Sequence, residues 1–255
     1  MLHIGFEKTG TKAIQYWLRD HEDLLAEHSL RFPRGWLRLN VHQELPLCLM
    51  RLDRLCSPRE LGDEWRDARW RSDVLDQIAV DLAAHRNERT VLSSENLDLL
   101  RYDVEFAALR ALVGDAEIVA YLRYEPEWVE ALRWQYLHKN APGRTLSDDR
   151  DAYNYLGPDT WRSDYDTLLS GWRRWFSRVK VMYYDFAVAA EGSVIPSFLR
   201  YLRLPVVDVG GYNLNRRGEP TPRDPGNRTY GLAFGTGTTE AQADGMFLQT
   251  STPAN

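Results

Sequence analysis

The sequence lacks several features that would have assigned it to a specialised class of protein. Its 255 residues include only two cysteines, Cys48 and Cys56, and their spacing of eight positions fits neither a disulfide framework nor a metal site. No apolar run approaches the ~18 residues that a membrane-spanning helix needs. No basic segment followed by an apolar one opens the chain. We therefore expect a cytoplasmic protein without a membrane span, a secretory leader or a bound metal.

Lysine is also scarce, because only four of the 32 basic residues are lysines and the other 28 are arginines. Two of the four, Lys8 and Lys12, lie in the first turn region of the chain. The formal net charge of −5 argues against a general nucleic-acid-binding protein. A hydrophobic content of 44% and a charged content of 27% are ordinary for a globular domain, and the length suits one α/β domain with a sizeable core.

The most informative segment is residues 3–15, His-Ile-Gly-Phe-Glu-Lys-Thr-Gly-Thr-Lys-Ala-Ile-Gln. It predicts a short strand that ends at Gly5, a turn around Lys8, and a helix that begins near Thr11. Such a turn directs backbone N–H groups and the positive end of a helix at one point, where they bind a phosphate or a similar anion. The apolar face of the helix is formed by Ile14, Trp17, Leu18, His21 and Leu25.

This turn differs from the nucleotide-triphosphate loop G-x-x-x-x-G-K-[ST]. Gly5 and Gly10 have the right separation, but Thr11 occupies the lysine position and Lys12 follows one place late. Ala13 replaces the hydroxyl residue that would hold magnesium. The sequence therefore does not match an ATP or GTP loop at either of its chemical positions.

Strands and helices alternate along the rest of the chain, which favours a parallel sheet covered by helices on both faces. We expect a single domain over residues 1–212, and a loop with a poorly ordered terminus over 213–255, which is rich in Gly, Pro, Thr and Asn. The expected strands are 90–95, 117–123 and 179–184, and the expected helices are 103–113, 126–139, 159–176 and 193–204, with surface-exposed helices over 43–56 and 60–86.

Ligands of parallel sheets bind at the carboxyl ends of the strands. The residues expected there are Gly5, Glu95, Arg123 and Asp185. Arg123 follows the strand Ile-Val-Ala-Tyr-Leu and precedes a helix, which suits a second anion site. Taken alone, Arg123 could instead be a structural arginine that pairs with Glu125 or Asp185.

Two residues are candidates for a general base. Glu95 lies in Leu-Ser-Ser-Glu-Asn-Leu at the end of a strand, and His42 lies in the irregular segment Leu-Asn-Val-His-Gln. A carboxylate needs burial or a hydrogen-bond partner to raise its pKa for this role, whereas histidine titrates near neutrality unaided. We rank Glu95 first and His42 second.

Lys-Thr-Gly-Thr after a strand ending His-Ile-Gly resembles the 5′-phosphosulfate loop of sulfotransferases that use PAPS (3′-phosphoadenosine 5′-phosphosulfate). The strand-end Arg123 resembles the 3′-phosphate motif of that family. The segment from Asp164 to Leu202 is similar to the last helix–strand–helix of bacterial carbohydrate sulfotransferases, so the resemblance covers roughly residues 1–215.

The resemblance implies a P-loop NTPase-like sulfotransferase fold, a three-layer α/β sandwich with a central parallel sheet. It implies transfer of sulfonate from PAPS to a hydroxyl of a carbohydrate or glycolipid acceptor, with PAP (3′-phosphoadenosine 5′-phosphate) as product and no metal required. Lys8 would stabilise the transferring group, Arg123 would bind the 3′-phosphate, and Glu95 or His42 would deprotonate the acceptor. The 5′ end would be bound by Gly5, Lys8, Thr9, Gly10, Thr11 and Lys12.

The sequence departs from the family pattern at three positions. Glu7 adds negative charge beside the loop, which Lys12 would offset, and Ala131 stands where a serine is expected eight residues after Arg123. Arg133, Gln135 or residues 213–217 would then have to replace the missing hydroxyl. Two alternatives remain open at this point: a P-loop kinase or NTPase with Asp185 as its magnesium carboxylate, and a nucleotide-binding module without turnover.

Overall fold

The structure is a computed structural model, and it describes residues 1–34, 42–54, 56, 63–138 and 146–212. The predicted tail 213–255 lies outside the described residues, so its expected lack of order stays a prediction. No helix in the described ranges is long and apolar enough to cross a membrane.

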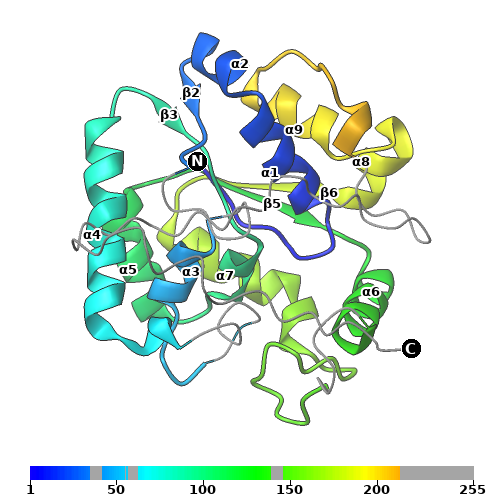
Figure 1. Cartoon of the computed structure of the whole chain (residues 1–255). Helices are drawn as coiled ribbons and strands as arrows, with labels where there is room; N and C mark the ends of the chain where they lie inside the picture. The colour runs from blue at the N-terminus through cyan, green and yellow to red at the C-terminus, as the bar shows by residue number, and fades with distance from the viewer. Residues whose placement is uncertain (35–41, 55, 57–62, 139–145, 213–255) are drawn as a thin grey trace, which may run out of the picture.

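A parallel sheet of four strands in the order β4-β1-β5-β6 lies at the centre of the molecule (Figure 1). Its strands are β1 (Leu2–His3), β4 (Leu92–Ser93), β5 (Ile118–Leu122) and β6 (Val179–Tyr183). All three strand pairs are parallel, with Leu2 opposite both Leu92 and Ile118. Parallel alignment brings the carboxyl ends of all four strands to the same edge, where the sequence analysis expected its candidate residues.

The predicted single strand 90–95 is in fact two short strands that belong to different sheets. β3 (Arg89–Thr90) pairs with β2 (Leu30–Arg31), while β4 pairs with β1. The change of partner occurs within two residues, because the N–H of Val91 donates to Arg31 O and the N–H of Leu92 donates to Met1 O. The 3-10 helix η3 (Glu95–Leu99) then begins at the residue proposed as base.

Helices cover both faces of the sheet, as Figure 1 shows, so the predicted three-layer α/β sandwich is confirmed. The alternation of β5 explains both layers, because Ile118 and Ala120 pack into one core cluster while Val119 and Tyr121 pack into the other. One face carries α3 (Glu44–Leu49), α4 (Ala68–Ala84), α5 (Asp103–Val113), α6 (Glu125–His138) and α7 (Tyr165–Trp175). The other carries α1 (Thr11–Asp20), α2 (Glu22–Glu27), α8 (Tyr184–Glu191) and α9 (Ile195–Leu202).

The expected surface helix over 43–56 is wrong in both length and burial. In the described part of 43–56, α3 is the only helix, and all six of its residues are buried. The helix ends at Met50, where the backbone becomes extended. Because α3 contacts α4, α5 and η3, it fills the layer beneath α4 instead of lying on the surface. The second expected surface helix, 60–86, is α4 preceded by a 3-10 turn, η2 (Glu64–Arg66). Most of its described residues are exposed or partly exposed, and Trp65, Val74 and Ile78 are buried.

The expected helix 159–176 is divided in two. A 3-10 turn, η4 (Trp161–Ser163), precedes α7, and Asp164 lies between them. The Asp164 carboxylate accepts a hydrogen bond from the Thr167 N–H at 3.0 Å, which is the geometry of a helix N-cap. Helix α8 was not expected at all, since the sequence analysis ended the last strand at Tyr184 and resumed a helix at residue 193.

The last described element is a short 3-10 turn, η5 (Gly210–Tyr212), which packs against α1. The indole N–H of Trp17 donates to Val207 O at 3.0 Å, and the Tyr212 hydroxyl donates to Asp20 at 3.1 Å. These two contacts hold the chain after α9 against the helix that follows the Lys8 turn.

Candidate active site

The turn between β1 and α1 begins where the chain leaves the sheet. The N–H groups of Ile4 and Phe6 still donate to β5 carbonyls, at 3.0 and 3.2 Å. Gly5 has a positive φ of 103°, and a Cβ added there would lie 3.1 Å from the Cα of Glu95. Glycine is therefore required at residue 5, because it allows the turn to approach the start of η3.

The beginning of α1 presents unpaired backbone donors. Gly10 is the N-cap in the left-handed conformation, and no side chain caps the helix. Among the described residues, the N–H groups of Thr9, Gly10, Thr11 and Lys12 have no hydrogen-bond partner. These donors and the positive end of a ten-residue helix provide a cradle for an anion.

The hydroxyls of Thr9 and Thr11 form hydrogen bonds within the turn. Thr9 Oγ1 and Thr11 Oγ1 both donate to Phe6 O, at 2.6 and 3.1 Å, and both residues are buried. In this arrangement they stabilise the turn, and the backbone amides are the groups that face outward. Lys12 is exposed at the start of α1.

Lys8 adopts a positive φ of 61°, which projects its side chain from the turn toward α6. Its ammonium donates to Gln135 Oε1 at 2.8 Å. The ammonium therefore lies beside the turn whose backbone N–H groups face outward.

Arg123 meets this turn from the neighbouring strand. It follows the carboxyl end of β5, and its Nη1 lies 3.5 Å from Lys8 O. It also forms ion pairs with Glu127 at 3.2 Å and with Asp185 at 3.9 Å, and its guanidinium lies 5.0 Å from the centre of the Tyr184 ring. The structure thus brings the two expected anion anchors together. The expected structural partner Asp185 is present, and Glu127 takes the place expected for Glu125.

Glu95 lies partly buried at the start of η3, beside the Lys8 turn. Burial raises the pKa of its carboxyl above the usual value, the Glu7 charge raises it further, and the Lys12 and Lys8 charges oppose the rise. A carboxyl with a raised pKa that lies beside two lysines has the properties expected of a general base.

His42 is fully buried, and both of its ring nitrogens bind backbone groups. Nδ1 accepts the Ser93 N–H at 2.9 Å, which leaves Nε2 as the donor to Pro33 O at 2.9 Å. Burial lowers the pKa of His42 to about 4. These contacts give His42 a structural role beside β4, and the geometry favours Glu95 over His42 as the base.

Glu7 does not carry the unpaired charge that the sequence suggested, and Lys12 is not its partner. Its carboxylate is buried and accepts hydrogen bonds from Arg162 at 2.9 Å and from the Tyr136 hydroxyl at 2.7 Å. Arg162 also donates to Asp98 at 3.2 Å. No sequence signal marked Arg162, because an arginine in a tryptophan-rich segment gives no sign that it is buried.

The position after Arg123 that lacks a serine is on α6. Ala131 offers no hydroxyl, and Arg133 cannot replace it directly because its guanidinium donates to Leu156 O. Gln135, the next residue considered, is the partner of Lys8. The segment 213–217, which was also expected to compensate, lies outside the described residues.

Asp185, the carboxylate required by the kinase alternative, has partners of its own. It accepts the Tyr124 N–H at 2.7 Å and faces Arg123. Within the described ranges, no group of three or more His, Cys, Asp or Glu side chains is arranged to hold a metal ion.

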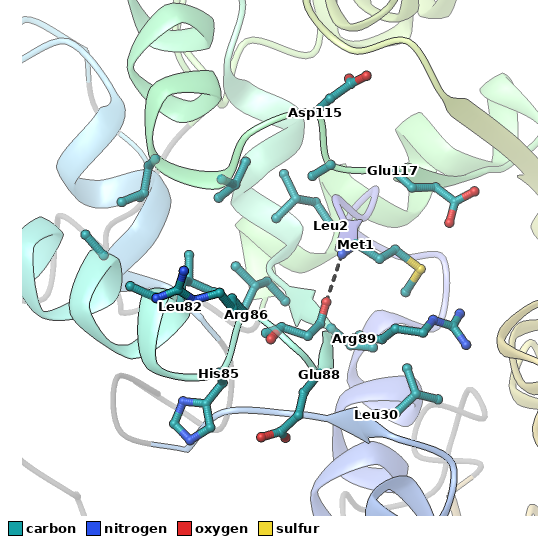
Figure 2. Close-up of a pocket in the computed structure, with 18 of the residues that line it drawn as sticks. Met1, Leu2, Leu30, Leu82, His85, Arg86, Glu88, Arg89, Asp115 and Glu117 are labelled. Atoms are coloured by element: carbon teal, nitrogen blue, oxygen red, sulfur yellow. Dashed lines mark hydrogen bonds between the residues drawn. The ribbon is translucent and has the colours of Figure 1, made fainter.

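A cavity of about 1360 Å³ lies at the opposite edge of the sheet (Figure 2). It is lined by residues at the amino ends of the strands, including Leu2, Glu117 and Arg178. None of the candidate site residues lines it. This cavity therefore does not coincide with the candidate active site.

Comparison with known proteins gives one informative result. No family model and no curated protein matches the chain. Among solved structures, the chain is similar to a sulfotransferase from Alicyclobacillus acidocaldarius, with a TM-score of 0.53, 13% sequence identity and coverage of 85% of each chain. The chain therefore has a sulfotransferase fold, which confirms the fold class predicted from the sequence.

Proposed function

We propose that the protein is a PAPS-dependent sulfotransferase that transfers sulfonate to a hydroxyl of a carbohydrate or carbohydrate-containing acceptor. The observation that carries the proposal is the convergence of two anion anchors, since Arg123 at the end of β5 lies 3.5 Å from the backbone of Lys8. A donor with phosphate groups at both its 3′ and 5′ positions needs two such anchors.

The residues present fit this donor. The unpaired N–H groups of Thr9 to Lys12 would hold the 5′ end, and Arg123, whose Nε is buried without a hydrogen-bond partner among the described residues, would hold the 3′-phosphate. When bound, PAPS supplies an activated sulfonate on its 5′-phosphate. Gly10 keeps the turn close to α9, because a Cβ there would lie 2.6 Å from Val194 Cγ2.

The chain's own residues would supply positive charge and a base. The Lys8 ammonium would stabilise negative charge that develops between the donor and the acceptor oxygen. The Glu95 carboxylate would accept the proton of the acceptor hydroxyl, and its raised pKa makes it a stronger base than an exposed glutamate. A carbohydrate acceptor rests on the sequence resemblance alone.

Calorimetry with PAP and with ATP, each in the presence of a metal chelator and then of magnesium, tests the ligand class. We expect PAP to bind with the same affinity in chelator, and Arg123→Met to weaken PAP binding by about tenfold or more, because a charge-assisted hydrogen bond is lost. Arg173→Met, on the end of α7, serves as the matched control. Binding of ATP through magnesium together with no binding of PAP would contradict the proposal.

A nucleotide-binding module without turnover is the second candidate, and Ala131 is the observation that favours it. The hydroxyl that the family pattern expects is absent there, and Arg133 is held by Leu156 O. Transfer of radiolabelled sulfonate from PAPS to a panel of sugars separates the two candidates. PAP binding without transfer to any acceptor would support the module, and transfer would exclude it.

A further inference from the structure

A buried ionic cluster lies directly behind the Lys8 turn. Arg162 is only 1% exposed, and its guanidinium donates to the carboxylates of Glu7 and Asp98, to the Tyr136 hydroxyl at 2.8 Å and to Tyr153 O at 3.1 Å. Four segments that are distant in the sequence therefore meet at one side chain. A planar guanidinium with five donors is the group that can hold several acceptors in fixed directions.

One branch of the cluster leads to Lys8. The Oε2 atom of Glu7 accepts a hydrogen bond from Arg162. Its Oε1 atom accepts one from the Gln135 amide N–H at 3.4 Å. Gln135 in turn accepts the Lys8 ammonium at 2.8 Å. The backbone of the turn is held as well, because the Trp128 indole N–H donates to Glu7 O at 2.8 Å.

The other branch leads to the residue proposed as base. Asp98 lies three residues after Glu95 in the same 3-10 helix, and residues with that separation lie on one face of such a helix. The chain just before Glu7 also lies against Glu95, because a Cβ added at Gly5 would lie 3.1 Å from the Glu95 Cα.

Two carboxylates and one guanidinium would leave this buried cluster negative. Burial raises the pKa of Asp98 to about 8, with the charge of Glu7 adding to the rise and that of Arg162 opposing it. Glu7 is the nearer of the two acidic partners of Arg162, at 2.9 Å against 3.2 Å for Asp98. A buried ion pair gives little net stability over apolar residues of the same size, so its value lies in fixing geometry.

We propose that Arg162 is a positioning residue that holds the Lys8 turn and the Glu95 turn in a fixed relative arrangement, so that charge stabilisation and proton removal act on the same substrate atoms. The inference rests on the proposed function for its catalytic meaning. Its structural content, the coupling of residues 3–14 to residues 93–100, can be tested on the protein alone.

The test compares wild-type protein with Arg162→Lys, and with Arg174→Lys as the matched control. Arg174 lies on the exposed side of α7, where its side chain is 61% exposed and pairs with Asp103. Lysine at residue 162 keeps the charge but cannot hold three acceptors in a plane. Hydrogen exchange followed by mass spectrometry is measured for segments 3–14 and 93–100, with α4 and β6 as internal references.

We expect Arg162→Lys to speed exchange about tenfold or more in both segments and to leave α4 and β6 unchanged, because only local opening is made easier. The kcat for sulfonate transfer should fall by about tenfold to a hundredfold, as small misplacements of reacting groups do, while the Kd for PAP changes by less than about threefold. The control should match wild type in all three measurements.

Unchanged exchange in both segments would overturn the inference, and so would faster exchange throughout the chain with a normal kcat for the folded fraction. Exchange is measured without ligand and does not depend on transfer activity. A wild-type protein that transfers no sulfonate would count against the proposed function, while the exchange result would still decide whether Arg162 couples the two segments. If Arg162→Lys does not fold, Glu7→Gln takes its place. It should speed exchange in 3–14 more than in 93–100, and no change there would overturn the inference.

Discussion

At the scale of single residues, Arg123 is paired with carboxylates before any ligand binds. It faces Glu127 and Asp185, whose side chains are 59% and 42% exposed. Ion pairs this open to solvent contribute at most about 1 kcal/mol. An incoming phosphate can therefore replace these carboxylates at Arg123 at small cost.

Glu95 gives the first prediction at this scale. Its pKa is raised mainly by burial, and the carboxyl can accept a proton only when it is ionised. The rate of sulfonate transfer should therefore fall as the pH drops below the raised pKa of Glu95, and rise to a plateau above it. A measurement of kcat against pH checks whether the rate falls on the acid side as expected.

Two variants separate Glu95 from His42 in the same experiment. Glu95→Gln should lower kcat by about 10²-fold or more and remove the fall in rate at low pH, as expected on loss of a general base. His42→Asn should keep the fall in rate at low pH, measured on the fraction of the protein that remains folded. If kcat of Glu95→Gln still falls at low pH, another group is the base.

At the scale of the elements, the turn that carries Lys8 depends on two glycines and on close packing against α9. Gly10 has a φ of 81°, and a Cβ there would meet Val194 Cγ2 at 2.6 Å. Gly192, at the end of α8, has a φ of 70° and nothing within 4 Å of its added Cβ. Both glycines have a positive φ, but only Gly10 has a close neighbour. A comparison of alanine variants at the two positions therefore distinguishes the cost of backbone strain from the cost of steric contact.

Gly10→Ala should therefore destabilise the protein more than Gly192→Ala. Left-handed backbone costs an alanine about 1–2 kcal/mol at either position, and the contact with Val194 adds about 1–3 kcal/mol at residue 10 alone. Urea unfolding of the two variants measures the difference. Equal losses of stability would show that the turn relaxes away from α9.

The elements also show what the sequence could and could not predict. The bounds of α5 were predicted residue for residue, because a strong apolar period ends at a glycine. Helix α8 was missed since it follows β6 without a turn residue, and α3 was placed on the surface although every one of its residues is buried. Burial against α4 and η3 is a tertiary property that local patterns do not carry.

The same contrast holds for the site. The Lys8 turn and Arg123 were predicted because strand ends followed by helices mark anion sites locally. The partners of Glu7 were not, since Arg162 lies 155 residues further along the chain and Tyr136 lies 129. Contacts over such separations depend on the packing of whole layers, which no spacing rule specifies.

At the scale of the whole molecule, the adjacency of β1 and β5 is what assembles the site. Parallel pairing of neighbouring strands brings the Lys8 turn and Arg123 to one edge, and β4, on the other side of β1, brings Glu95 to the same edge. The large cavity at the amino ends of the strands contributes no candidate residue. Strand order therefore determines where the candidate site residues lie.

Two buried histidines bind Ser93 of β4, and we expect them to make the fold sensitive to acid. His3 binds Ser93 Oγ through Nδ1 at 2.8 Å, and His42 accepts the Ser93 N–H. Burial lowers the pKa of His3 to about 3 and that of His42 to about 4. A histidine of the unfolded chain has a pKa of about 6.5, so the stability from each neutral histidine is complete above that pH. It is lost as the pH falls toward the pKa in the folded protein, about 4 for His42 and about 3 for His3.

For His42 this loss amounts to about 3 kcal/mol across the window, since each pKa unit corresponds to about 1.4 kcal/mol. Urea unfolding at pH 7 and at pH 4.5 should therefore show a large fall in the free energy of unfolding for wild type and a smaller fall for His42→Asn. His138→Asn, on the exposed side of α6, is the matched control and should keep the wild-type difference. If His42→Asn also keeps it, His42 does not contribute to the acid sensitivity of the fold.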